Sequence, residues 1–133
     1  MIKAVFFDWF NTLARYEPPR EELHSRAFQE FGFELTPEEI FPGILIADKY
    51  FFEENIRSRV EERSPEEKFK VYLHYQEIML TEAGVNIPRE LLLKIMERSN
   101  QLFKGTTFVL FDDVLPTLKT LKEQNLILAP LTN

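Results

Sequence analysis

The chain has 133 residues and no cysteine, and 22 acidic residues against 16 basic ones give it a net charge of −6. Its length is typical of one ordinary domain, and 44% hydrophobic residues indicate a globular fold rather than a disordered tail. The acidic balance argues against nucleic acid and anionic membranes as partners, and the lack of cysteine excludes disulfides, thiolate nucleophiles and cysteine-ligated zinc.

The N-terminal run IKAVFF, residues 2–7, predicts a β-strand, because it is almost continuously apolar, β-branched and aromatic. Such a run is typical of a strand that is covered on both faces in a parallel sheet. Asp8 interrupts the run too early for a signal peptide or a membrane span. We therefore expect a cytoplasmic protein with no membrane partner.

Helical periodicity follows from about residue 20. The first apolar stripe contains Leu23, Ala27, Phe28 and Phe31. Two segments, TPEE at 36–39 and SPEE at 64–67, each combine a hydroxyl cap, a proline at the first helical position and a glutamate at the third. Gly84 and Gly105 are expected to end later helices. The pattern predicts four helices between the first strand and a loop near 105–112.

The last part of the chain predicts one more helix and one more strand. Asp112 and Asp113 open the helix, where acidic side chains suit the helix dipole. The run LILAPL, residues 126–131, predicts a second buried strand, which Thr132 follows. Ligands of open parallel sheets bind outside the carboxyl ends of the strands, so Asp8 and Thr132 mark a candidate site.

These residues resemble the motifs of the haloacid dehalogenase superfamily of hydrolases. The first family motif is a strand followed by Asp-x-Asp-x-Thr, and the corresponding residues are Asp8-Trp9-Phe10-Asn11-Thr12. The second is an apolar strand that ends in Ser or Thr, which LILAPLTN at 126–133 matches.

The resemblance covers the whole chain and implies an α/β fold. In that fold, residues 1–13 and 106–133 form a partial Rossmann-like core of parallel strands. Residues 14–105 form an inserted α-helical cap domain.

The resemblance also implies a catalytic role for Asp8. This side chain is the nucleophile, which forms a covalent intermediate with a small anionic substrate that water then opens. Thr132 hydrogen-bonds the anionic oxygens of the substrate, and Asn133, Phe10 and Asn11 also belong to the substrate-binding site.

Two residues of the loop after Asp8 have structural roles in this interpretation. Asn11 adopts the tight left-handed turn that Gly often occupies in the family, and Thr12 braces the loop. The alternative interpretation of Asp8 is that it only caps this turn.

Phe10 is where the sequence departs from the phosphatases of the family. They have a second Asp there, which protonates the leaving alcohol and activates water. An aromatic residue instead resembles the dehalogenases, whose halide leaves without a proton, and the simplest alternative is that Phe10 packs under the cap. The sequence therefore favours a 2-haloacid dehalogenase-like hydrolase that needs no cofactor.

Two other functions stay open. In a phosphatase-like hydrolase, Mg²⁺ would be held by Asp8 and by the backbone carbonyl of Phe10. In a catalytically silent member of the family, the helical cap would bind a partner.

The dehalogenases also carry an early cap arginine that holds the substrate carboxylate or halide. Residues 40–55 contain Lys49 as the only cation. Arg57 and Arg59 come later and are interpreted as solvated surface charges.

The family completes its site after the second motif, with a lysine and an acidic motif, and this sequence ends at Asn133. Two core strands with one crossover helix would leave an apolar sheet edge unpaired. We expect a C-terminal segment of a longer protein, a second copy in a homodimer, or another chain to complete the core. The complete protein is predicted to be a hydrolase, and these 133 residues alone are predicted to be inactive.

Overall fold

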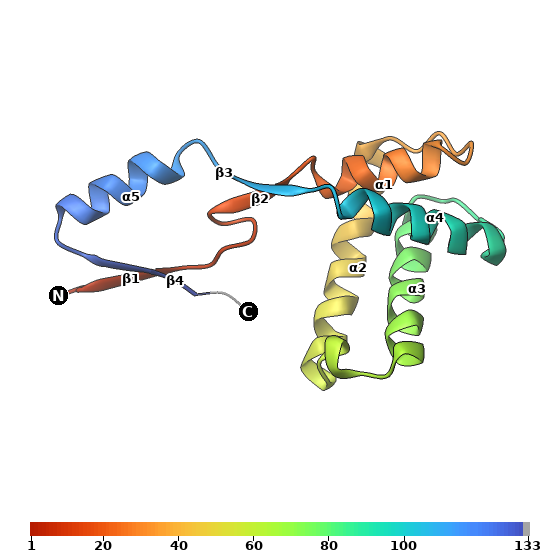
Figure 1. Cartoon of the computed structure of the whole chain (residues 1–133), viewed down its shortest axis with the longest axis horizontal. Helices are drawn as coiled ribbons and strands as arrows, with labels where there is room; N and C mark the ends of the chain where they lie inside the picture. Colours follow the sequence, from red (N-terminus) through yellow and green to blue (C-terminus); the bar gives the residue numbers. More distant parts are fainter. Residues whose placement is uncertain (132–133) are drawn as a thin grey trace. The chain divides into compact units, whose positions relative to one another are not determined.

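The computed structural model describes residues 1–131, which form a mixed α/β structure that is mostly helical (Figure 1). The elements along the chain are β1 Ala4–Phe7, β2 Ala14–Glu17, α1 Arg20–Gln29, α2 Pro37–Arg57, the 3₁₀ turn η1 Val60–Glu62, α3 Pro65–Glu82, α4 Arg89–Phe103, β3 Thr107–Leu110, α5 Val114–Glu123 and β4 Ile127–Pro130. None of the helices formed by the described residues combines the length and the apolar character needed to cross a membrane.

The chain divides into two compact units. The sheet unit contains residues 1–19 and the described residues from 106 onward, and the helical unit contains residues 20–105. The helical unit is therefore inserted in the sequence of the sheet unit, between β2 and β3.

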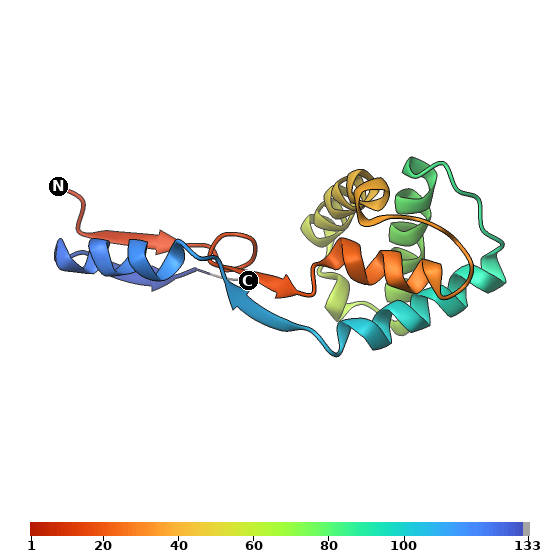
Figure 2. The same ribbon diagram turned by 90° about the horizontal axis from the view of Figure 1, so that it is seen from above.

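The sheet unit contains a small parallel sheet of β1 and β4, which lie side by side in Figure 2. Ala4 is paired with Ile127 and Phe7 with Pro130, and α5 is the crossover helix that packs against β4. Both strands lie within the segments predicted from the sequence, 2–7 and 126–131.

The described residues do not cover these strands on both faces, although their composition is typical of buried strands. Phe6 is 65% exposed, Ile127 is equally open to solvent, and no residue of β1 or β4 is fully buried. The physical reason is the small number of layers, since two strands beside one helix cannot enclose apolar side chains on both faces.

The second sheet was not predicted. β2 and β3 pair antiparallel, with Ala14 opposite Leu110 and Glu17 opposite Thr107. The sequence interpretation placed residues 14–17 in the cap and 107–110 in a loop. Strands of four residues carry little periodic signal, and this pair is stabilised by a contact between distant residues, because the ring of Tyr16 stacks on Phe108 with centroids 4.8 Å apart.

The helical unit is built from α1 to α4, and both predicted capping boxes are present. At α2, Glu39 N donates to Thr36 Oγ1 over 3.3 Å, and the Glu39 carboxylate accepts from Thr36 N over 2.9 Å. Ser64 and Glu67 form the same pair of bonds at α3. Each box satisfies two backbone N–H donors at the start of a helix, which defines where α2 and α3 begin.

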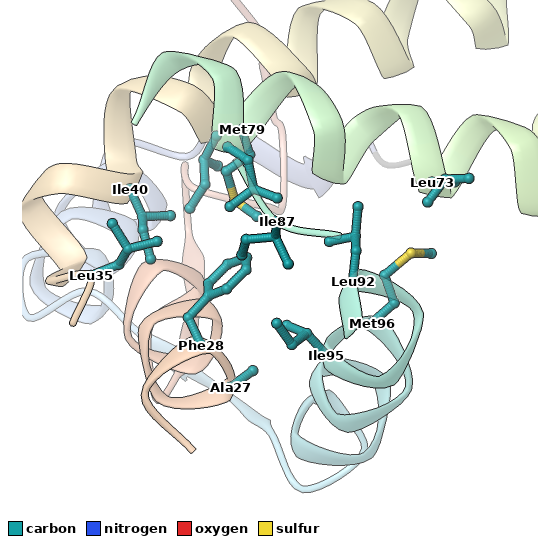
Figure 3. Packing of buried hydrophobic residues seen from close by; sticks show 12 residues of the cluster. Ala27, Phe28, Leu35, Ile40, Leu73, Met79, Ile87, Leu92, Ile95 and Met96 are labelled. Carbon is teal, nitrogen blue, oxygen red and sulfur yellow. The ribbon is translucent and has the colours of Figure 1, made fainter. Parts of the chain in front are cut away.

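One hydrophobic cluster holds these helices together (Figure 3). Phe28 from α1 lies fully buried at its centre, and Ile40 and Ile44 from α2 and Ile95 from α4 are likewise closed to solvent. The predicted stripe of α1 is confirmed, because Leu23, Ala27 and Phe28 are buried and Phe31 packs against the cluster.

Gly43 lies at a close approach between the backbones of α2 and α3. A Cβ atom at this position would lie 2.6 Å from the carbonyl oxygen of Met79 and 2.9 Å from its Cα, so the two backbones leave no room for a side chain. We expect Gly43→Ala to lower the free energy of unfolding by about 1–3 kcal/mol, because the helices must separate. Urea unfolding followed by circular dichroism measures this change.

Gly105→Ala is the matched control. The nearest atom to a Cβ there is the Leu102 carbonyl oxygen at 3.5 Å, an ordinary contact, and stability should hardly change. A Gly43→Ala variant as stable as the wild type would contradict the close packing.

Candidate active site

Asp8 stands directly after β1, at the end of the sheet where the carboxyl ends of both parallel strands meet. The amide of Leu131 donates to the carbonyl of Phe7 over 2.7 Å, which continues the β1–β4 ladder one residue beyond β4. Asp8 and Leu131 are therefore the first residues after β1 and β4, at the same end of the sheet. Its side chain is exposed, so the carboxylate is open to a ligand from solvent.

A tight turn after Asp8 holds the carboxylate in place. The amides of Leu13 and Ala14 both donate to the carbonyl of Trp9 over 3.0 Å, and Asn11 N donates to Ala14 O over 2.7 Å. Asn11 has a φ of 58°, the left-handed conformation predicted for it. The Thr12 hydroxyl lies 3.1 Å from Asp8 Oδ2 and donates to it, which orients the carboxylate against its own loop.

Two predicted site residues, Thr132 and Asn133, lie outside the described residues. The part of the site that the structure describes therefore consists of Asp8, Phe10, Asn11 and Thr12. All four belong to the sheet unit and to one continuous segment of chain.

Phe10 belongs to an aromatic cluster of four rings. The ring centroids of Phe10 and Tyr16 are 5.1 Å apart, and Phe108 lies 6.5 Å from Phe10 in an edge-to-face arrangement. Trp9 completes the cluster, 5.9 Å from Phe108. Tyr16 lies in β2 and Phe108 in β3, and Trp9 lies in the loop after β1, so these rings all belong to the sheet unit. The cluster places an apolar surface beside the loop that carries Asp8.

The described residues offer Mg²⁺ a small ligand set. No group of three Asp, Glu or His side chains suited to a metal is found among residues 1–131. The ligands that the sequence interpretation names are the Asp8 carboxylate and the backbone carbonyl of Phe10, two residues later in the loop. Protein-bound Mg²⁺ commonly uses one or two carboxylates together with water and substrate phosphate. This set fits a magnesium ion that depends on its substrate for the other ligands.

The cations that the sequence interpretation singles out in residues 40–59 lie at the surface of the helical unit. Arg57 at the end of α2 pairs with Glu54, and Arg59 just before η1 pairs with Glu62. Both arginines are exposed, as their interpretation as surface charges predicted. Lys49 is exposed on α2.

Sequence reasoning missed a network in the helical unit. Arg20 at the start of α1 donates both terminal nitrogens to the carboxylate of Asp48, over 3.0 and 2.7 Å. The Tyr75 hydroxyl on α3 donates to the same carboxylate over 2.8 Å, and burial, with Asp48 beside it, raises the pKa of Tyr75. The three residues are far apart in sequence, so no local spacing could have revealed them.

Comparison with known proteins identifies no family for this chain. No protein-family model matches it, and no curated protein matches it.

Proposed function

We propose that the chain belongs to a hydrolase similar to the haloacid dehalogenase superfamily, which acts on a small anionic molecule through a covalent intermediate on Asp8. The observation that carries this proposal is the position of Asp8, an exposed carboxylate at the carboxyl end of β1 in a parallel pair with β4. The order of the elements along the chain supports the corresponding fold, a partial Rossmann-like core with an inserted helical cap. The proposal includes a cytoplasmic location for the protein.

The proposed reaction has two balanced steps. A carboxylate oxygen of Asp8 attacks the carbon that carries the halogen, and the carbon–halogen bond breaks as halide leaves with its electron pair. Water then attacks the carbonyl carbon of the resulting ester. This step releases a 2-hydroxy acid and one proton and regenerates the Asp8 carboxylate. Thr12 donates to Oδ2, so Oδ1 is the oxygen that we assign to the attack.

The aromatic environment of Phe10 favours carbon–halogen cleavage over phosphate ester hydrolysis. A phenylalanine cannot protonate a leaving alkoxide, whereas halide needs no proton. The rings of Tyr16 and Phe108 against Phe10 also make the surroundings apolar, which suits the carbon skeleton of a small haloacid. If Mg²⁺ binds instead, Asp8 and the Phe10 carbonyl would hold it, and the ion would neutralise charge on a substrate phosphate.

The test compares the rate of halide release with the rate of phosphate release by the complete protein. We expect it to release halide from 2-haloacids faster than phosphate from simple monoesters, because no acid occupies position 10. Ion chromatography for halide and a colorimetric assay for phosphate measure both rates on one preparation. Mg²⁺-dependent phosphate release without halide release would contradict the dehalogenase-like assignment and support the phosphatase-like one.

Trapping identifies the nucleophile of the proposed reaction. A slow haloacid should leave an ester on Asp8, as peptide mass mapping of the trapped protein would show. Modification elsewhere would refute this role for Asp8. If the protein reacts with neither 2-haloacids nor phosphate monoesters, the result would favour a catalytically silent family member whose cap binds a partner.

A further inference from the structure

Helix α2 exposes a row of large apolar side chains. Phe41 is 44% exposed, Leu45 53%, Phe52 64% and Ile56 69%, while the opposite face of the same helix is buried in the core through Ile40, Ile44 and Ala47. Exposed apolar side chains gathered on one face of a helix mark interaction sites in proteins. We refer to these four residues as the α2 stripe.

The spacing of the α2 stripe is the same from either end. Leu45 lies one helical turn after Phe41, Phe52 lies two turns after Leu45, and Ile56 lies one turn after Phe52. All four therefore lie on one narrow face of the helix. A second α2 running in the opposite direction would meet this face in register, with Phe41 against Ile56 and Leu45 against Phe52 in both halves.

The charges at the middle of the stripe have the same symmetry. The midpoint falls between Asp48 and Lys49, which carry opposite charges. In the antiparallel arrangement, Lys49 of each copy faces Asp48 of the other. Asp48 is already held by Arg20 and Tyr75, so its carboxylate is fixed before association and little side-chain freedom is lost.

We propose that the α2 stripe is the contact surface for a second copy of this chain, in a two-fold symmetric dimer with antiparallel α2 helices. A two-fold interface must be self-complementary, so that each residue that contacts a partner residue is contacted by its equivalent in return. The reversible spacing of the stripe and the opposite charges at its midpoint meet this requirement. A partner of different sequence would need neither property.

Sedimentation of the chain over a range of concentrations tests the proposal. We expect a monomer–dimer equilibrium, and we expect Phe52→Asp to raise its dissociation constant at least about a hundredfold, because each dimer would bury the new charge twice. Phe52 is largely exposed, so helical content measured by circular dichroism should be unchanged. The matched control is Leu115→Asp on α5, which is 65% exposed and should leave association intact.

Disulfide trapping tests the geometry, because the chain has no cysteine of its own. Lys49→Cys places a thiol beside the proposed two-fold axis and should give a covalent dimer on mild oxidation. Glu90→Cys, exposed on α4, should stay monomeric under the same conditions. A monomer at all concentrations, or association that Leu115→Asp abolishes and Phe52→Asp does not, would overturn the proposal.

Discussion

Asp8→Asn is expected to lower turnover by the complete protein at least about ten-thousandfold, because an amide oxygen is a far weaker nucleophile than a carboxylate oxygen. Asn matches the shape of Asp and retains a carbonyl oxygen to accept from Thr12, so the loop geometry at 3.1 Å should persist. The measurement is steady-state halide or phosphate release, whichever the wild-type protein performs.

Asp112→Asn provides the matched control for this prediction. Asp112 is another exposed acid of the sheet unit, in the turn before α5, and its substitution should leave turnover unchanged. Because an asparagine can deamidate back to aspartate, Asp8→Ala serves as a second inactive variant. Wild-type rates in both Asp8 variants would show that Asp8 only caps the turn, which is the alternative interpretation of its position.

The helices were predictable because their signals are local. Thr36 with Glu39, and Ser64 with Glu67, form capping boxes whose partners are three residues apart, and both boxes occur where the sequence predicts them. Gly84, predicted to end a helix, has a φ of 71° just after α3. The residues that start or end a helix contact one another within a single turn. The local sequence is therefore sufficient to predict where these helices begin and end.

Features that depend on distant residues were not predictable in the same way. β2 is stabilised by pairing with β3, about ninety residues later in the chain, and Arg20 finds its partner Asp48 on another helix. The exposure of Phe6 is a related case. An apolar run predicts a strand, but the layers that cover it come from other parts of the fold.

The candidate site shows both kinds of feature. The left-handed conformation of Asn11 and its place in the turn after Asp8 follow from the local sequence. The aromatic partners of Phe10 do not, because Tyr16 and Phe108 reach it through the unpredicted β2–β3 pair. The turn after Asp8 could therefore be predicted from the sequence, but the apolar surface beside it could not.

His24 on α1 is a buried titratable group in the helical unit. Its ring packs against Phe103 with centroids 5.2 Å apart and stacks over Tyr75, and its Nδ1 atom has no hydrogen-bond partner among the described residues. Burial, together with the nearby Arg20 charge, lowers the pKa of His24 from 6.5 to about 4, although Asp48 acts in the opposite direction. The folded protein therefore keeps this imidazole neutral at pH values where the unfolded chain binds a proton.

This difference makes the helical unit sensitive to mild acid. Above pH 6.5 the imidazole is neutral in both states, so it does not change stability with pH. As the pH falls from 6.5 to about 4, only the unfolded chain gains the proton, and unfolding becomes easier by about 1.4 kcal/mol per pH unit. We expect a loss of about 2 kcal/mol between pH 7 and pH 5, and of about 3 kcal/mol once the pH is below 4.

Urea unfolding at pH 7 and pH 5 checks this expectation, and the choice of pH separates His24 from the carboxylates. Glu30, Glu54 and Glu61 accept hydrogen bonds that lower the pKa of each below 4.5, so their contributions are lost only at more acidic pH. His24→Leu, which replaces the buried ring by an apolar side chain of similar size, should remove most of the loss between pH 7 and pH 5. His74→Gln, at an exposed position on α3, should retain it. If His24→Leu lost as much stability as the wild type over this range, the acid sensitivity would have to come from another group.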